Sequence, residues 1–325
     1  MLIEKVDIKE NRILRLDEQL LEILLKDKTT GSNLIWATDN YNRYGPKYYS
    51  DAKIKKELIT GLNGNIIKPR VEKSKSEQQK RIKDKAEVFT PSWICNVQNN
   101  LIDEAWFGYK NVFNVEKEKT WIVNQNKIVF TNEIGKTWLD YIKENRLEIS
   151  CGEAPYLVSR YDTVTGNPID VQDRIGLLDR KLRVICENSE DEQQWLNYAK
   201  LAYKSIYGYD WQGDNVLLAR ENLLYTIMDF YLYKFNKMLD KKILMEFADI
   251  ITWNIFQMDG LKFVIPNSCK CIRKRQITFF DENNLDNKCV GCSENNINKH
   301  LGIYCNIKDW ETNKAIRFVT LLNNK

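Results

Sequence analysis

The sequence predicts an α/β fold built on a parallel sheet, with a helical extension before it and a cysteine-rich segment after it. Two observations carry this prediction. From residue 86 onward, short apolar strand segments alternate with helical segments, as in a parallel sheet with crossover helices. Five of the eight cysteines and the only histidine lie between residues 269 and 305. We therefore divide the chain into an N-terminal helical and basic extension (1–85), an α/β domain (86–265), and a cysteine-rich segment with the last elements of that domain (266–325).

Length and composition indicate a globular protein with a substantial core. The chain has 325 residues, of which 43% are hydrophobic and 29% charged. No apolar run approaches the roughly 20 residues needed to cross a bilayer, and the charged N-terminal segment does not resemble a signal peptide. We therefore expect a cytoplasmic protein without a membrane partner, whose cysteines are thiols or metal ligands rather than disulfides.

The N-terminal extension begins with a predicted helix and continues into a basic segment. Leu and Ile recur at helical spacing over residues 13–26. Residues 68–85 hold eight basic and three acidic side chains, a net charge of +5. Such a run is either a solvated face or linker, or an arm that contacts DNA phosphates. In the second interpretation the DNA-binding residues are Lys73, Lys75, Lys80, Arg81 and Lys83.

Two further basic clusters and one aromatic group allow the same pair of interpretations. The basic clusters lie within residues 270–275 and 174–183. The aromatic group is either core or a platform on which unpaired bases stack, and it consists of Trp36, Tyr41, Tyr44, Tyr48 and Tyr49.

Three predicted strands of the α/β domain each end near a carboxylate. Glu148 lies in "LEIS", Asp210 closes "IYGYD", and Asp259 follows "WNIFQM". The helical segments expected around them are "KTWLDYIKENR", "DEQQWLNYAKLAYKS", "NVLLARENLLYTIMDFYLYKF" and the first part of "ILMEFADIITWN". Ligands of parallel sheets bind at the carboxyl ends of the strands.

The residues at these strand ends suit an adenosine ligand. The Cys151-Gly152 turn lets a ligand approach the backbone, and Glu148 can hold a cationic or hydroxyl group. Asp210 can accept from two ribose hydroxyls while Trp211 covers the adenine ring. Asp259 can accept from the adenine amine.

Four segments in order carry a family resemblance: "AEVFTPSWICN", "LEISCGEAPYL", "IYGYDWQGDNVLLARENLL" and "IFQMDGL". They resemble the S-adenosylmethionine-binding half of the adenine-N6 DNA methyltransferases of restriction-modification systems, and more closely the family named restriction endonuclease subunit M. The resemblance implies a Rossmann-like methyltransferase sheet, S-adenosylmethionine as cofactor and DNA as partner. By motif position it assigns cofactor contacts to Phe89, Thr90, Pro91, Glu148, Cys151, Gly152, Asp210, Trp211 and Asp259.

The chain departs from the family at the acceptor site, because it contains no Asn-Pro-Pro-Tyr motif. That motif polarises the adenine amine and stacks on the flipped base. Two segments are candidates for a drifted acceptor loop: "VIPNSC" with Asn267, and "YCNIKDWE" with Asp309 and Trp310.

Two functions therefore stay open. One is the modification methyltransferase, acting on adenine N6 through an unusual acceptor loop or a second modification subunit. The other is a catalytically inactive, methyltransferase-like subunit that binds DNA or cofactor and regulates or targets a partner nuclease.

The cysteine-rich segment predicts a structural zinc site. Cys289, Cys292, His300 and Cys305 follow the spacing C-x2-C-x7-H-x4-C, and three thiolates with one imidazole make a closed tetrahedral site. Cys269 and Cys271 precede them as alternative ligands. The remaining alternative is a group of reduced thiols in a loop.

Overall fold

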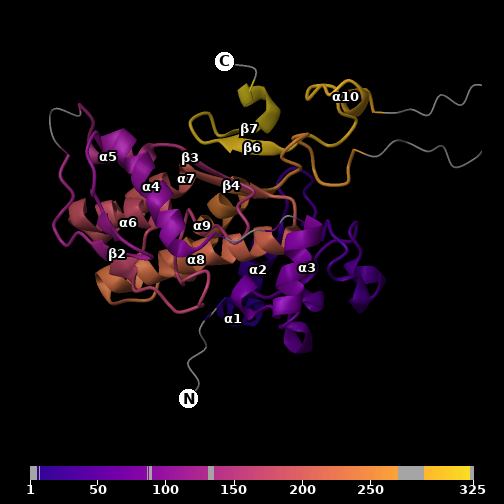
Figure 1. The fold of residues 1–325 in the computed structure, drawn as a ribbon, viewed down its shortest axis with the longest axis horizontal. Coiled ribbons are helices and arrows are strands. Elements are labelled where there is room, and N and C mark those ends of the chain that lie inside the picture. Colours follow the sequence, from indigo (N-terminus) through magenta and orange to yellow (C-terminus); the bar gives the residue numbers. More distant parts are fainter. Residues whose placement is uncertain are drawn as a thin grey trace, which may run out of the picture.

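The protein has a mixed α/β structure, in which helices surround small sheets (Figure 1). The computed structural model describes residues 6, 8–85, 87, 90–130, 135–269 and 289–322. Its central sheet has three parallel strands in the order β3-β4-β5. They are β3 (Arg146–Ile149), β4 (Ile206–Asp210) and β5 (Ile255–Gln257). The predicted parallel sheet is thus confirmed.

The three parallel strands end at the same edge of the sheet and are connected by crossover helices. Leu147 pairs with Tyr207 and Tyr209 with Phe256, so the three strands end at one edge. Helices α6 (Leu177–Asn188) and α7 (Glu192–Lys204) connect β3 to β4, and α8 (Gly213–Phe235) and α9 (Lys241–Asn254) connect β4 to β5. Parallel strands need such crossovers because a tight turn cannot join them.

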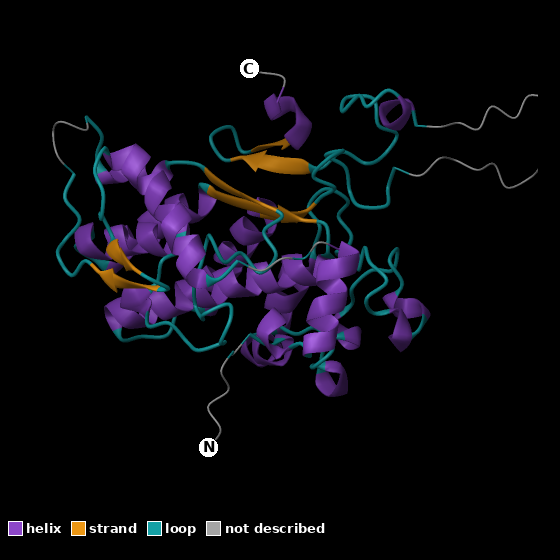
Figure 2. Cartoon of the chain, in the orientation of Figure 1, coloured by secondary structure: helices purple, strands orange, loops and turns teal. Residues whose placement is uncertain are grey.

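Two hydrophobic layers enclose the sheet. The larger one contains α8 and α9, and α8 is buried along most of its length. On the opposite side, the hairpin of β6 (Asn306–Asp309) and β7 (Lys314–Arg317) lies over the sheet (Figure 2). Ile307 of the hairpin and Phe318, which follows it, share an apolar cluster with Tyr209 and Phe256.

The N-terminal extension belongs to the main core. Helices α1 (Glu10–Leu16) and α2 (Glu18–Leu25) are separated at Asp17, whose side chain accepts from the Gln19 amide and caps α2. One continuous cluster of buried residues runs from Val6 to Ile255. The hydrophobic packing therefore crosses the boundary that we predicted at residue 85.

One strand differs from its prediction. The apolar segment "LEIS" indicated a buried strand, but Leu147 is 45% and Ile149 66% exposed, and only Glu148 is buried. The reason is that β3 pairs with β4 alone within the described residues and stands at the edge of the sheet.

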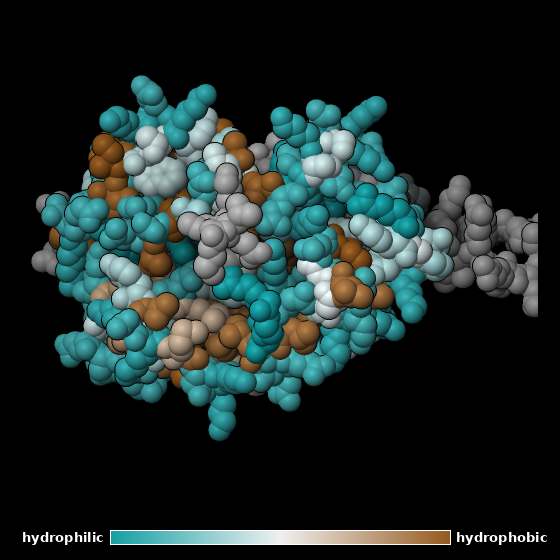
Figure 3. Space-filling view, turned by 90° about the horizontal axis from the view of Figure 1, so that it is seen from below, coloured by the Kyte–Doolittle hydropathy of each residue, from teal (hydrophilic) through white to brown (hydrophobic). Residues whose placement is uncertain are grey.

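Among the described residues, no helix is both long and apolar enough to span a bilayer. Figure 3 shows the face seen from below the view of Figure 1, where hydrophobic residues form separate patches among hydrophilic ones. The remaining helices and strands are α3 (Lys75–Lys85), α4 (Ser92–Phe107), β1 (Asn114–Lys117), β2 (Thr120–Val123), α5 (Trp138–Lys143) and α10 (Val290–Ser293).

Candidate functional site

A tight loop leaves β3 at the carboxyl edge of the sheet. Ser150, Gly152 and Ala154 all have positive φ, at 50°, 53° and 63°. Only glycine adopts this region without steric cost, so the two other residues hold backbone strain of the kind that clusters at ligand sites. The Cys151 amide donates to the Tyr209 carbonyl (2.8 Å), which extends the β3–β4 pairing into the loop.

Asp210 binds this loop directly. The Gly152 amide donates to Asp210 Oδ2 (3.0 Å), and the Gln212 amide donates to Oδ1 (2.8 Å). Burial raises the pKa of Asp210 from 3.8 to about 6, although these two amides oppose the shift. The carboxylate is therefore a buried acceptor between the glycine loop and the start of α8.

Glu148 lies next to Asp210 and is not fully hydrogen-bonded. Its Oε1 accepts from the Tyr156 amide at 3.4 Å, while Oε2 is buried and has no partner within the described residues. Burial first, and the nearby charge of Asp210 to a lesser degree, raise the pKa of Glu148 well above its usual range. An unsatisfied buried oxygen costs about 1–3 kcal/mol, so a ligand that donates here recovers that free energy.

Gln212 joins Asp210 to two distant segments. Its side-chain amide donates to Glu87 Oε2 (2.7 Å) and accepts from Asn40 Nδ2 (2.9 Å). Glu87 belongs to the segment "AEVFTP", so this segment reaches the same strand end as Asp210. Gln212 was not predicted as a site residue. It lies two residues after an Asp that ends a strand, and at this spacing the Asp side chain can accept from the Gln212 amide and cap the turn.

The rest of the "VFTP" motif is seen only in part. Phe89 lies outside the described residues. The Thr90 carbonyl accepts from Thr163 Oγ1 (2.9 Å), and Pro91 immediately precedes α4. These contacts fix the backbone beside the strand ends.

Asp259 accepts hydrogen bonds within its own turn. Its Oδ1 accepts from the Leu261 and Lys262 amides (3.0 and 3.1 Å), and its Oδ2 lies 3.9 Å from Lys262 Nζ. Asp259 stabilises its own turn because those amides follow it directly in the chain. The convergence of the three carboxylates on one ligand stays a prediction.

Trp211, which we expect to cover the adenine ring, lies at the surface beside the N-terminal region. It follows Asp210, is 37% exposed, and its indole donates to the Ala37 carbonyl (3.0 Å). This bond holds one edge of the ring against the N-terminal region.

The acceptor-loop candidates have structural roles. Asp309 accepts from Thr312 Oγ1 and from the Glu311 amide, so it closes the β6–β7 turn. The Trp310 indole donates to Asn254 Oδ1 (2.9 Å). Asn267 has a positive φ of 60° in the turn that leads to Cys269. Asp309 and Trp310 thus have hydrogen-bond partners in the β6–β7 turn and in α9, and their role in an acceptor loop stays a prediction.

Two of the five predicted DNA-binding cations are buried. Arg81 donates to Asp214 Oδ2 (2.8 Å) and to Glu87 Oε2 (3.0 Å), and Lys73 is only 8% exposed. This corrects their prediction as residues of an exposed arm, whereas Lys75, Lys80 and Lys83 are exposed on α3.

Of the two other basic clusters, the structure describes only the one at residues 174–183. Arg180 pairs with Asp103, and Lys181 donates to Ser205 Oγ (2.6 Å), so residues 174–183 contribute to the interior. The cluster at 270–275 lies outside the described residues.

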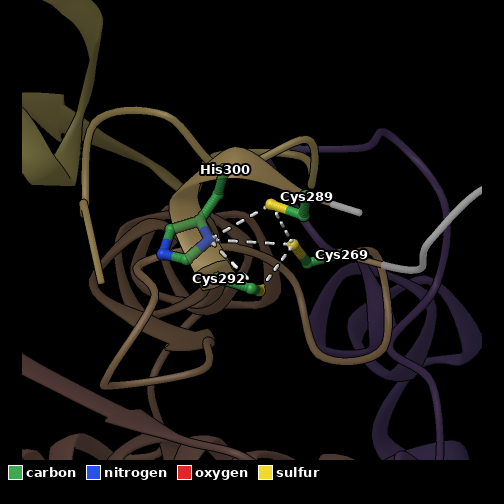
Figure 4. A group of neighbouring side chains, drawn as sticks. All are labelled: Cys269, Cys289, Cys292 and His300. Carbon is green, nitrogen blue, oxygen red and sulfur yellow. Dashed lines mark hydrogen bonds between the residues drawn. The ribbon is translucent and has the colours of Figure 1, made fainter. Parts of the chain in front are cut away.

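Three cysteines and one histidine form a candidate metal centre (Figure 4). Their ligand atoms lie within 4.8 Å of one another. Cys269 Sγ is 3.6 Å from Cys292 Sγ and 3.7 Å from His300 Nδ1, and Cys289 Sγ is 3.6 Å from the same nitrogen. Tetrahedral zinc places its sulfur ligands about 3.8 Å apart and sulfur and nitrogen about 3.6 Å apart, so this cluster could hold a zinc ion.

The backbone supports this geometry. The Leu301 amide donates to Cys289 Sγ (3.2 Å). Burial would raise the pKa of the Cys289 thiol, but this amide and the neighbouring thiol and imidazole lower it to about 6. Gly291 packs so closely that an added Cβ would lie 2.6 Å from the His300 backbone nitrogen and 2.7 Å from Nδ1, so only glycine fits at this position of the C-x2-C turn.

Cys305 is not a ligand, which corrects the expected ligand set at one position. Its thiol is buried and donates to the Gln257 carbonyl (3.4 Å) at the end of β5. Cys269, one of the two alternatives, takes the fourth place, and Cys271 lies outside the described residues. The sequence could not separate these cysteines because the choice depends on how the chain returns from β5.

Comparisons with protein-family models, with curated proteins and with solved structures gave no significant match. A proposal for the function therefore has to come from the geometry of the strand-end site and of the cysteine–histidine cluster.

Proposed function

We propose that this protein binds S-adenosylmethionine at the carboxyl edge of the β3–β4 pair and serves as a DNA adenine-N6 methyltransferase subunit of a restriction-modification system. The observation that carries the proposal is the bond between Asp210 and the Gly152 amide, which joins a buried acid to a strained glycine loop. A Rossmann-like methyltransferase sheet uses the same two parts, a loop after one strand and an acid after the next.

The residues at this edge fit the proposed cofactor. Asp210 offers a carboxylate to ribose hydroxyls, and the partly exposed Trp211 ring follows it. Glu148 Oε2 is a buried acceptor to which no described residue donates, which suits an amino or hydroxyl group of the ligand. When bound, S-adenosylmethionine would supply an electrophilic methyl group, while the chain's own residues hold and orient the adenosyl moiety.

A second function is favoured by one observation. Asp309 and Trp310, which we considered for the acceptor loop, are engaged in the β6–β7 hairpin. The alternative is a non-catalytic, methyltransferase-like subunit that binds cofactor or DNA and regulates or targets a partner nuclease. In both cases the cofactor site is the same.

We further propose that the metal of the Cys3His cluster is a structural zinc ion. All four ligand positions are filled by protein side chains, which leaves no open position for a substrate. The ion would join the segment that begins at Cys289 to the turn that ends at Cys269.

Two assays on one preparation separate these functions. Equilibrium dialysis with labelled S-adenosylmethionine measures binding, and label incorporation into mixed-sequence duplex DNA measures transfer. Binding with incorporation supports the methyltransferase, and binding without incorporation supports the non-catalytic subunit. A preparation that binds no S-adenosylmethionine contradicts both.

A further inference from the structure

A pocket of about 350 Å³ lies between the loop at residues 39–44, the segment at 65–68 and helix α3. Its chemistry differs from that of the strand-end site, because cationic side chains dominate its lining. Five of them line the pocket against two acids, Asp39 and Glu77. The five are Arg43, Lys68, Lys73, Lys80 and Arg81.

The two arginines are already neutralised. Arg43 donates to Glu77 (2.8 Å), and Arg81 donates to Asp214 and Glu87. The three lysines make no ion pair with any residue that the structure describes. An anion in the pocket would therefore meet amines that no described carboxylate already pairs.

Lys73 is the strongest indication of a ligand. Its side chain is 92% buried, and Nζ is fully buried without a hydrogen-bond partner in the described part of the chain. Glu153, Glu87 and Asp214 attract it at longer range, but none of them bonds to it. A buried amine without an acceptor is costly, whereas a phosphate offers several strong acceptor oxygens.

Aromatic rings border the same pocket. Tyr41 and Tyr44 are stacked, with ring centroids 6.5 Å apart and an interplanar angle of 28°. Tyr41 is fixed by its bond to Asp214 (2.6 Å), while Tyr44 is 42% exposed and the Arg43 guanidinium lies 4.9 Å from its ring centroid. The ring and the guanidinium together give a partly exposed planar surface on which a base beside the phosphate can stack.

We infer that this pocket binds the phosphate group of a nucleotide, with Lys73, Lys68 and Lys80 as the contacts. The phosphate can belong to a nucleic-acid strand or to a free nucleotide. The inference goes beyond the proposed function, since the pocket is lined by other residues than the strand-end site and requires no S-adenosylmethionine.

The test is calorimetric titration of the full chain with three probes: inorganic phosphate, adenosine monophosphate, and a single-stranded hexadeoxynucleotide without terminal phosphates. We expect saturable binding that Lys73→Met weakens by about tenfold or more, the usual effect of losing one charge-assisted contact. Lys80→Gln, at an exposed position, should weaken it by about threefold or more on the same grounds. Lys110→Gln is the control, because the Lys110 side chain is 75% exposed, follows α4 and does not line the pocket.

The arms of the test identify the source of the phosphate. Tighter binding of the oligonucleotide assigns the pocket to a nucleic-acid strand, and tighter binding of the monophosphate or phosphate assigns it to a free nucleotide. The inference is overturned if the wild type binds none of the probes, or if Lys110→Gln weakens binding as much as Lys73→Met. S-adenosylmethionine binding, measured on the same variants, should not change, so a failure of the cofactor proposal is seen separately.

Thermal unfolding separates ligand binding from a structural role of Lys73. Without ligand, Lys73→Met should unfold at the same or a higher temperature, because it removes an unbonded buried amine and keeps the aliphatic stem. A large decrease in unfolding temperature would indicate that the acids around Lys73 need its charge for folding, and would contradict the inference.

Discussion

Replacing Asp210 with Asn should stabilise the unliganded protein at neutral pH and remove cofactor binding at the same time. The pKa of Asp210 is raised from 3.8 to about 6. Between these values the unfolded chain loses its proton before the folded chain does, so the folded state loses stability as the pH rises. Above pH 6 this loss of folding stability amounts to about 3 kcal/mol, since one pKa unit corresponds to about 1.4 kcal/mol.

The substitution also has a cost. Asn keeps one of the two oxygens that accept from the Gly152 and Gln212 amides, and the lost bond costs about 1 kcal/mol. At pH 7.5 the free energy of unfolding of Asp210→Asn should therefore exceed that of the wild type by about 2 kcal/mol, the gain of about 3 kcal/mol less the lost bond of about 1 kcal/mol. At pH 4, where the folded wild type is protonated, only about 0.5 kcal/mol of the gain remains, so the variant should be less stable than the wild type by about 0.5 kcal/mol.

Urea unfolding of both proteins at pH 4 and pH 7.5 measures this difference. Asp309→Asn is the control of opposite sign, because hydrogen bonds from Thr312 and the Glu311 amide lower the pKa of Asp309, so its replacement should reduce stability at pH 7.5 rather than increase it. An Asp210→Asn variant that is less stable than the wild type by the same amount at both pH values would contradict the raised pKa of Asp210.

Three other predictions concern the metal centre and the buried ion pair. Cys269→Ser should reduce bound zinc from one equivalent to near none by elemental analysis, whereas Cys305→Ser should retain it; the reverse result would restore Cys305 as a ligand. Gly291→Ala should weaken zinc affinity by at least about tenfold in a chelator competition, because the added Cβ displaces His300 from its place, and unchanged affinity would contradict that packing. Arg81→Met should cost about 3–5 kcal/mol in urea unfolding by leaving Asp214 buried without its cation, while Lys83→Met on the exposed side of α3 should change little; equal effects would contradict the burial of this pair.

The sequence predicts the elements of the α/β domain because their signals are local. Apolar residues at helical spacing indicate α7 and α8, and the short β-rich run "IYGYD" coincides with β4. These segments keep their local preference in the folded chain because the core buries the same faces that the pattern marks.

Contacts between distant segments were not predictable in this way. The basic run at 68–85 gave no sign that Arg81 would be buried against Asp214, a residue 133 positions later. Its charge pattern suits an exposed face, and only the packing of α3 against the start of α8 selects the buried side. For the same reason the sequence could not show that Asp259 turns toward its own loop while Glu148 and Asp210 share one strand edge.

The candidate zinc ligands could be predicted from the sequence only in part. Cys289, Cys292 and His300 were predicted from spacing, because a C-x2-C turn brings two sulfurs to one side of a short helix. The fourth ligand depends on tertiary structure, since Gly302 allows Cys269 to approach within contact distance while Cys305 is drawn into the cluster around Tyr209 and Phe256.

The most direct test of the cofactor site is calorimetric titration of the wild type and of Asp210→Ala with S-adenosylmethionine at pH 7.5. We expect one saturable site per chain in the wild type. In the variant, affinity should fall by about a hundredfold, because two charge-assisted bonds to ribose hydroxyls are lost. Equal affinity in the two proteins, or no heat of binding in the wild type, would contradict the assignment of this strand edge to an adenosyl ligand.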